Sequence, residues 1–413
     1  RWKAGRPQSA APHGGVAPVV LSAVVRFPPF PPGRPVAACI DLGAAVHNHG
    51  VAVRLARGRE LVAVVKADAY GHGAAALART LEAAGARRLA VLTAEEGAQL
   101  RDAGVRLPIL VMGGVADRPE AEEVSGRGLV PVLHDARALE LLQAAAARRV
   151  QPLELEIEVD TGMRRMGVPA AELVGLVRVL AERPQLRLGG LYTHLACADE
   201  PELAPTLEQL RRLGVLLDAL AEDGLLPPRI HVANSAGVLR TAELEASLPP
   251  AVNGVRPGLM LYGIRPAREL APEVRLRPVM SLRTRVVALR EVAPGDGVGY
   301  GATFRAARPG RIATLPLGYG DGVPWHLGGR GLVRIGGRRL SFAGRVSMDY
   351  VTVDVGEAPV AVGDEALLFG CSADGGRLAV EEQAALAGTI AYELVTRVSP
   401  RVPRVLVGDA ERG

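Results

Sequence analysis

The sequence has 413 residues, of which 48% are hydrophobic and 23% are charged, a globular balance with room for two domains. The net charge is +5, but the 49 basic residues are interleaved with 44 acidic ones and no basic stripe carries aromatic residues, which disfavours nucleic-acid binding. No apolar run approaches the length of a membrane span, and the three cysteines have no metal-binding or disulfide spacing, so we expect no metal and a reducing compartment.

Residues 1–36 form an atypical N-terminal stretch. Its segment PPFPPGRP cannot form a packed element, so we expect a disordered leader or a start placed too early. Residues 16–25 are apolar, as in a signal peptide, but Pro18 interrupts them and PPFPP follows where a cleavage site belongs. Secretion is the less favoured interpretation, and we expect a cytoplasmic protein.

Between residues 37 and 270, short β-like segments alternate with Ala- and Leu-rich helical segments. Asp135 is a good N-cap, and the apolar residues of 170–182 have helical spacing. This alternation predicts parallel strands in a (β/α)8 barrel, with the first strand of the region joining the C-terminal domain instead. The eight expected barrel strands are 61–67, 88–93, 107–113, 129–134, 153–160, 187–195, 229–234 and 252–258.

Residues 271–413 have a different pattern. Short alternating segments are separated by glycine-containing turns, as in APGDGVGYGATF and GGRGLVRIGGRRL. This pattern predicts an all-β or mostly-β C-terminal domain, with the boundary near residues 265–270.

The expected strand 61–67 carries Lys66 near its C-terminal end, where barrel enzymes place their catalytic residues. The sequence has only two lysines, Lys3 and Lys66, against 47 arginines. Arginine stays charged, whereas a desolvated lysine amine loses its proton and can form a Schiff base. A surface lysine is the commoner case, but the scarcity of lysine and the GHG that follows favour a functional one.

Polar residues also follow later strands. In VRPGLMLYG, the backbone N–H groups of Gly258 and Leu259 suit a phosphate, although a tight turn explains the pattern as well. Ser235 in NSAG lies at an expected helix start, where phosphate binding and N-capping are equally good interpretations. His194 in YTHLACADE is by itself more often structural, and Tyr300 in GVGYGATF is a packed aromatic or an acid/base group.

The segment LELEIEVD, residues 153–160, alternates strictly. Its four acids face the barrel interior, where carboxylates are costly unless paired. Arg164 and Arg165 are the expected partners. One interpretation is a structural layer of ion pairs, and the other is that Glu158 holds an arginine that binds a substrate carboxylate.

Together these motifs resemble the alanine racemases, fold-type III enzymes that use pyridoxal 5′-phosphate (PLP). AVVKADAYGHG, VDTGMRRMG, YTHLACADE, HVANSAG, VRPGLMLYG, GYGATF, GYGDG, SMD and RVPRV occur in the family's order and spacing, over residues 37–408. The resemblance implies a TIM-like barrel followed by a mostly-β domain, a homodimer, and racemisation of alanine. The family's usual role is to supply D-alanine for peptidoglycan.

The resemblance also implies roles for individual residues. Lys66 would carry PLP and act as the base on one face of the substrate α-carbon, with Tyr300 of a partner subunit on the other face. Arg165 and the backbone N–H of Met348 would bind the substrate carboxylate. Arg256 would donate to the pyridine nitrogen and keep it unprotonated. The other expected residues are Tyr70, Ser235, Gly258, Leu259 and Tyr392 at the cofactor phosphate, His194 against the pyridine ring, His231 linking Arg256 towards Tyr300, and Asn234, Asp199 and Asp349 in support.

One position departs from the family pattern. Relatives often have a carbamylated lysine two residues before the Asp of DTGM, and its added carboxylate orients the substrate-binding arginine. This chain has Glu158 there. We hypothesise that Glu158 supplies the negative charge to Arg165 directly.

Two alternatives stay open. A serine racemase or a racemase of broader specificity would use the same scaffold and chemistry. A PLP-binding protein without turnover is the more remote alternative, because such relatives are usually a lone barrel without the β domain that carries Tyr300 and Met348.

Overall fold

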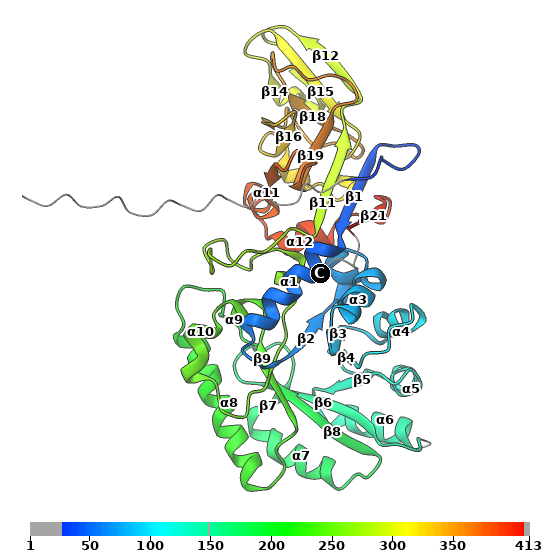
Figure 1. Cartoon of the computed structure of the whole chain (residues 1–413), viewed down its shortest axis with the longest axis vertical. Helices are drawn as coiled ribbons and strands as arrows, with labels where there is room; N and C mark the ends of the chain where they lie inside the picture. Colours follow the sequence, from blue (N-terminus) through cyan, green and yellow to red (C-terminus); the bar gives the residue numbers. More distant parts are fainter. Residues whose placement is uncertain (1–26, 148, 409–413) are drawn as a thin grey trace, which may run out of the picture.

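The computed structural model describes residues 27–147 and 149–408, and most of the expected leader lies outside them. The chain forms an elongated molecule with a helix-covered barrel at one end and a strand-rich part at the other (Figure 1). No helix within the described ranges is long and apolar enough to cross a membrane.

The predicted (β/α)8 barrel is confirmed. Its strands all pair in parallel, and contact between the first and last members of the row closes the sheet. In sheet order they are β5 (Val130–Leu133), β4 (Ile109–Val111), β3 (Arg88–Val91), β2 (Glu60–Val64), β10 (Gly254–Val255), β9 (Arg229–Ala233), β8 (Leu186–Tyr192) and β6 (Leu153–Asp160).

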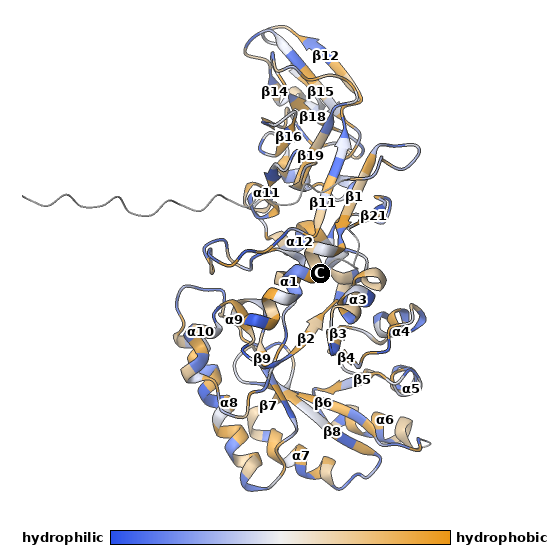
Figure 2. Ribbon diagram, viewed as in Figure 1, coloured by the Kyte–Doolittle hydropathy of each residue, from blue (hydrophilic) through white to orange (hydrophobic). Residues whose placement is uncertain are grey.

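The helices around the barrel begin where the sequence provides N-caps. Asp135 accepts a hydrogen bond from the N–H of Ala138 at 2.8 Å, and Thr93 forms a capping box with Glu96. The apolar residues of β6 point outwards into the core beneath the helices. The helix α8 has both polar and apolar residues along its length (Figure 2). The helices are α1 (Leu42–Leu55), α3 (Ala74–Ala83), α4 (Ala94–Asp102), α5 (Arg118–Gly126), α6 (Ala136–Ala146), α7 (Leu173–Ala181), α8 (Ala204–Glu222), α9 (Ser235–Leu239) and α10 (Thr241–Leu244).

The C-terminal part is mostly β, and its main sheet includes β1, the first strand of the described residues. β1 (Val36–Asp41) pairs antiparallel with β11 (Met280–Arg285) and parallel with β21 (Arg404–Val407). The sheet continues through β19 (Glu365–Cys371), β16 (Leu332–Ile335) and β17 (Arg338–Ser341). A second sheet consists of β12 (Ala288–Val292), β15 (Gly310–Leu315) and β18 (Val351–Asp354).

The prediction of a mostly-β C-terminal domain is confirmed, and the domain also contains helices. Two helices, α11 (Val380–Ala387) and α12 (Ala391–Thr396), lie between β19 and β21. Their sequences, VEEQAALA and AYELVT, are rich in helix-forming residues, and α12 contacts the segment that follows β2. The helix α12 therefore brings a C-terminal side chain, Tyr392, to the barrel.

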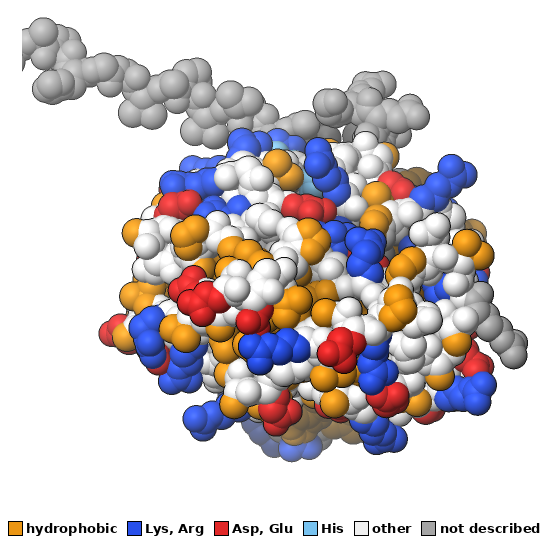
Figure 3. Space-filling view, turned by 90° about the horizontal axis from the view of Figure 1, so that it is seen from below, with side chains coloured by type: hydrophobic (Ala, Val, Ile, Leu, Met, Phe, Trp, Pro, Cys, Tyr) orange, Lys and Arg blue, Asp and Glu red, His pale blue; other side chains and the backbone are white. Residues whose placement is uncertain are grey.

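One face of the molecule has the mixed charge that the sequence predicts (Figure 3). On the face seen in Figure 3, arginine side chains alternate with acidic ones around the molecule and do not form a stripe of one sign. Such a distribution is typical of a solvated protein surface.

Candidate active site

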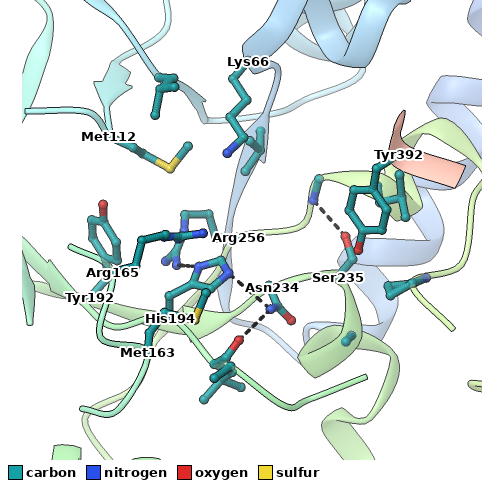
Figure 4. A pocket seen from close by; sticks show the side chains of 18 of the residues that line it. Lys66, Met112, Met163, Arg165, Tyr192, His194, Asn234, Ser235, Arg256 and Tyr392 are labelled. Carbon is teal, nitrogen blue, oxygen red and sulfur yellow. Dashed lines mark hydrogen bonds between the residues drawn. The ribbon is translucent and has the colours of Figure 1, made fainter. Parts of the chain in front are cut away.

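A cavity of about 560 Å³ opens at the C-terminal ends of the barrel strands. Side chains from several strands and from α12 point into it (Figure 4). No group of three or more His, Cys, Asp or Glu side chains that could hold a metal occurs in the described ranges. Twelve of the sixteen expected site residues line the cavity: Lys66, Tyr70, Glu158, Arg165, His194, Asp199, Asn234, Ser235, Arg256, Gly258, Leu259 and Tyr392.

Lys66 enters the cavity from a strained turn that directly follows β2. Four successive residues, Ala67 to Tyr70, have left-handed backbone conformations with φ between 51° and 54°. Each left-handed residue raises the conformational energy of the backbone by about 1–2 kcal/mol. Glu96 offsets part of this strain by accepting a hydrogen bond from the N–H of Ala67 at 2.6 Å. Burial, together with the charges of Arg165 and Arg256, lowers the pKa of Lys66. The turn thus presents an amine that loses its proton more readily than a surface lysine.

A polar cradle, formed by Tyr70, Ser235, Gly258 and Leu259, lines another part of the cavity. The hydroxyl of Ser235 accepts hydrogen bonds from the N–H groups of Gly258 at 3.0 Å and Met260 at 3.2 Å. Asn234 caps α9 by accepting from Gly237, so capping falls to Asn234 and not to Ser235. A Cβ at Gly258 would approach the hydroxyl of Tyr70 to 2.6 Å. The absence of a side chain at this glycine keeps the cradle open.

Behind the cavity, a buried hydrogen-bonded chain joins three charged or titratable groups. Arg256 lies 2.8 Å from Nδ1 of His231, and Nε2 of His231 lies 2.7 Å from Glu156. Because a guanidinium only donates, Nδ1 must accept and Nε2 must carry the proton. Burial lowers the pKa of His231, which keeps the ring neutral. The arginine therefore keeps its charge, and its orientation is fixed.

His194 lies beside the same arginine. Its Nδ1 accepts from the second terminal nitrogen of Arg256 at 3.1 Å, and the two lie together in Figure 4. Burial and the charge of Arg256 lower the pKa of His194 to about 3. The ring is thus uncharged and presents a flat surface to the cavity.

The partners expected for the barrel acids are wrong. Glu154 pairs with Arg88, Arg187 and Arg229, and Glu156 pairs with Arg88, Arg229 and His231. These partners lie on β3, β8 and β9, and their side chains reach the same layer of the barrel as the two acids. Arg164 and Arg165, in contrast, follow the end of β6. The inner acids therefore form a structural ion-pair layer.

Glu158, the third acid of β6, lines the cavity, but it does not pair with Arg165. The hydroxyl of Tyr192 donates to its Oε2 at 3.0 Å, and no ion pair of the described chain joins Glu158 to Arg165. The direct contact expected from the sequence is therefore absent. Asp160, two residues later, instead accepts from the N–H groups of Gly162 and Arg164.

Three expected residues lie away from the cavity, in the β domain. Tyr300 is 71% exposed and Met348 is 52% exposed. Asp349 pairs with Arg401 at 2.6 Å, and Arg401 also binds the buried Asp321. These contacts fix the loop that carries Met348. Within one chain, His231 is linked to Glu156 and not to Tyr300.

Several residues that support the site do not emerge from the sequence. Tyr192 lies under the guanidinium of Arg256, 4.2 Å from the ring centroid, and Tyr262 donates to the carbonyl of Val64 at 2.7 Å. The signal that could have found them is the scarcity of tyrosine, with only seven in the chain. For Glu96 the sequence contains only a weaker indication: its Thr-x-x-Glu spacing is typical of a capping box, which explains the residue without a role at the site.

Comparison with known proteins identifies similar sequences and structures. The family models "Alanine racemase, N-terminal domain" and "Alanine racemase, C-terminal domain" match residues 40–266 and 279–406. The alanine racemase of Sorangium cellulosum is 44% identical over 90% of this chain and 98% of its own length. That of Halothermothrix orenii is 40% identical over 90% and 96%.

Solved structures agree in fold. The crystal structure of alanine racemase from Streptomyces lavendulae has a TM-score of 0.85 and 34% identity, covering 92% of this chain and 100% of that one. The biosynthetic alanine racemase from Pseudomonas aeruginosa has a TM-score of 0.80 and 39% identity, covering 91% and 99%.

Proposed function

Because the chain belongs to the alanine racemase family, we propose that it interconverts L-alanine and D-alanine with PLP as its cofactor. In the family's usual role, the product D-alanine supplies peptidoglycan, and we place the enzyme in the cytoplasm. The observation that carries the proposal is the convergence on one cavity of Lys66, the Ser235–Gly258 cradle, Arg165 and Arg256.

The residues of the cavity fit this cofactor. The lowered pKa of Lys66 favours the neutral amine that bonds to an aldehyde. The cradle, which a Cβ at Gly258 would fill, has room beside Tyr70, Ser235 and Leu259 for a phosphate. Tyr392 completes the cradle from α12, and burial raises the pKa of its hydroxyl to about 12, so that it stays a hydrogen-bond donor.

When bound, PLP withdraws electrons from the substrate α-carbon and acidifies its proton. Racemisation then needs two bases, one that removes the proton and one that returns it from the opposite face. Lys66 serves one face. Tyr300 serves the other from a second copy of the chain, because it lies outside the cavity of its own subunit.

Arg256 sets the electronic character of the site. A guanidinium cannot accept a proton, and here it is held by His231, His194 and the carbonyl of Thr193. Placed beside the pyridine nitrogen of bound PLP, this guanidinium would keep that nitrogen unprotonated and the electron withdrawal moderate. Side reactions that need a long-lived charge are thereby disfavoured.

The substrate carboxylate is assigned to Arg165 and to the backbone N–H of Met348 in the partner copy. The guanidinium of Arg165 lines the cavity and has no hydrogen bond to a described residue. An arginine fork binds a carboxylate through two parallel hydrogen bonds. A homodimer is supported by the exposed Tyr300, Tyr350 and Met348, which a second copy would cover.

The proposal is tested by racemisation of L-alanine, with D-alanine detected through a D-amino-acid oxidase. The parent should be active, and Lys66→Ala should lose activity. Activity that survives in Lys66→Ala would refute the mechanism. Initial rates with L-serine and L-lysine separate a broader racemase from this one. A protein that binds PLP but exchanges no α-deuterium on alanine would support the non-catalytic alternative.

A further inference from the structure

Glu158 has two close neighbours on its buried side. Besides the hydroxyl of Tyr192, Nδ1 of His134 lies 3.5 Å from the same carboxylate oxygen, Oε2. His134 follows β5, the strand that pairs with β6 to close the barrel. Its side chain is 9% exposed and that of Glu158 is 8% exposed. The carboxylate and the imidazole therefore meet with little water between them.

The geometry determines where the protons of His134 lie. Nε2 is 2.9 Å from the carbonyl oxygen of Met112, which can only accept, so Nε2 carries a hydrogen. Nδ1 is buried and has no hydrogen-bond partner among the described atoms. Without a proton, its lone pair would face a carboxylate oxygen. With one, the two groups form an ion pair in which both charges are compensated.

The ring of His134 is also held in place by the backbone. Gly114 is in the left-handed region, and a Cβ there would lie 2.8 Å from Cδ2 of the imidazole. The ring thus packs directly against the chain that follows β4. It faces Glu158 because the carbonyl of Met112 and the backbone at Gly114 fix its plane.

Other charges around the carboxylate show what would happen if this pair were lost. Lys66, Arg165 and Arg256 line the same cavity as Glu158. Arg256 is already held by His231, His194 and Thr193, and Lys66 is the expected site of covalent attachment. Arg165 is therefore the cation that a released Glu158 would pair with.

We propose that His134, as an imidazolium, is a positioning residue that holds Glu158 on its own side of the cavity and leaves Arg165 free for the carboxylate of the substrate. The proposal rests on the function assigned above. It also gives Glu158 a role different from direct contact with Arg165. Removal of the His134 ring would release Glu158 to compete with alanine for Arg165.

The test uses the holoenzyme and separates KM from kcat. His134→Gln should raise KM for alanine about tenfold, the ratio that about 1.4 kcal/mol of competition produces, with kcat nearly unchanged. Glu158→Gln introduced into His134→Gln should return KM towards that of Glu158→Gln alone. The matched control is His47→Gln, because His47 also meets a carbonyl oxygen, that of Arg275 at 3.0 Å, but lies on α1 outside the cavity.

A second variant, His134→Asn, keeps the test open if His134→Gln does not fold. It also removes the ring that faces Glu158, so its KM should rise as in His134→Gln, and adding Glu158→Gln should cancel that rise. A rise that persists after Glu158→Gln is added would overturn the proposal, as would an unchanged KM in folded His134→Gln or His134→Asn. A parent with no alanine racemisation would instead refute the proposed function, so the two failures are distinguishable.

Discussion

Arg256 donates to Nδ1 of His231 across 2.8 Å, and this contact determines that the other ring nitrogen carries the proton. Through this N–H, His231 donates a hydrogen bond to Glu156, which is buried and also paired with Arg88 and Arg229. Burial alone would raise the pKa of Glu156, but His231 and the two arginines hold it well below its usual range. The orientation of Arg256 is thus anchored to the ion-pair layer of the barrel.

Arg256→Lys should lower kcat by about 100-fold, the cost of removing one well-placed donor. A lysine ammonium cannot reach His231, His194 and the carbonyl of Thr193 as the planar fork does. Steady-state kinetics measure the loss, with Arg118→Lys on exposed α5 as the control. A kcat equal to that of the parent would contradict the role assigned to the arginine fork.

Gly258→Ala should weaken PLP binding by about 10- to 100-fold, the equivalent of about 1–3 kcal/mol of overpacking. The added Cβ would lie 2.6 Å from the hydroxyl of Tyr70 and fill the cradle. Titration of the apoenzyme with PLP measures the change. Gly214→Ala is the control, because its Cβ on α8 would meet nothing closer than 3.7 Å, and it should leave PLP affinity unaltered.

Lys66 should react with amine-selective reagents at a lower pH than the side-chain amine of free Nα-acetyl-lysine, because burial and nearby arginines lower its pKa and only the neutral amine is nucleophilic. The chain has only two lysines, so peptide mapping after acetylation of the apoenzyme assigns the label on Lys66 without ambiguity. A pH profile of labelling equal to that of the free amino acid would show that the cavity does not perturb the amine.

Mixing Lys66→Ala with Tyr300→Phe should restore activity that neither variant has alone. If Tyr300 acts in the cavity of the partner, half of the dimers after subunit exchange are mixed, and each has one intact site. The expected activity is about a quarter of the parent's for random pairing. An inactive mixture, with exchange verified by mass spectrometry of the native dimer, would mean that Tyr300 acts in the cavity of its own subunit, and a fully active Tyr300→Phe would place Tyr300 outside the mechanism.

Asp321→Asn should destabilise the protein by about 1–3 kcal/mol, because Asp321 is buried and its arginine partners are partly exposed. Burial alone would raise its pKa, but Arg401, Arg34 and the N–H of Gly318 lower it. A lowered pKa contributes stability above the unfolded value, about 3.9, and loses it as pH falls through the folded value. The free energies of unfolding of parent and variant, measured by denaturation, should therefore converge as the pH falls. A difference between them that stays constant down to pH 2 would exclude the ion pairs as the cause of the stabilisation.

The order of the elements follows from the amino-acid sequence, and so does the set of residues expected at the site, most of which line one cavity. Alternating β-like and helical segments predict the barrel, and the position of Lys66 after a strand predicts its place at the mouth. These features are local, because periodicity, caps and strand ends are properties of neighbouring residues. The motifs are also short and keep a fixed order along the chain, so the family resemblance is visible in the sequence itself.

The pairing of the charges depends instead on the closed barrel. The partners of Glu156 and Glu158 lie on β8, on β9, at the start of β3 and directly after β5. They are distant in sequence: His231, for example, is 75 positions away from Glu156. Nothing in the local sequence distinguishes Arg229 from Arg165 as a partner for an inward-facing acid. The physical reason is that closing the barrel brings side chains from distant strands into one layer, and in that desolvated interior each carboxylate must pair with the cation or donor that lies within reach.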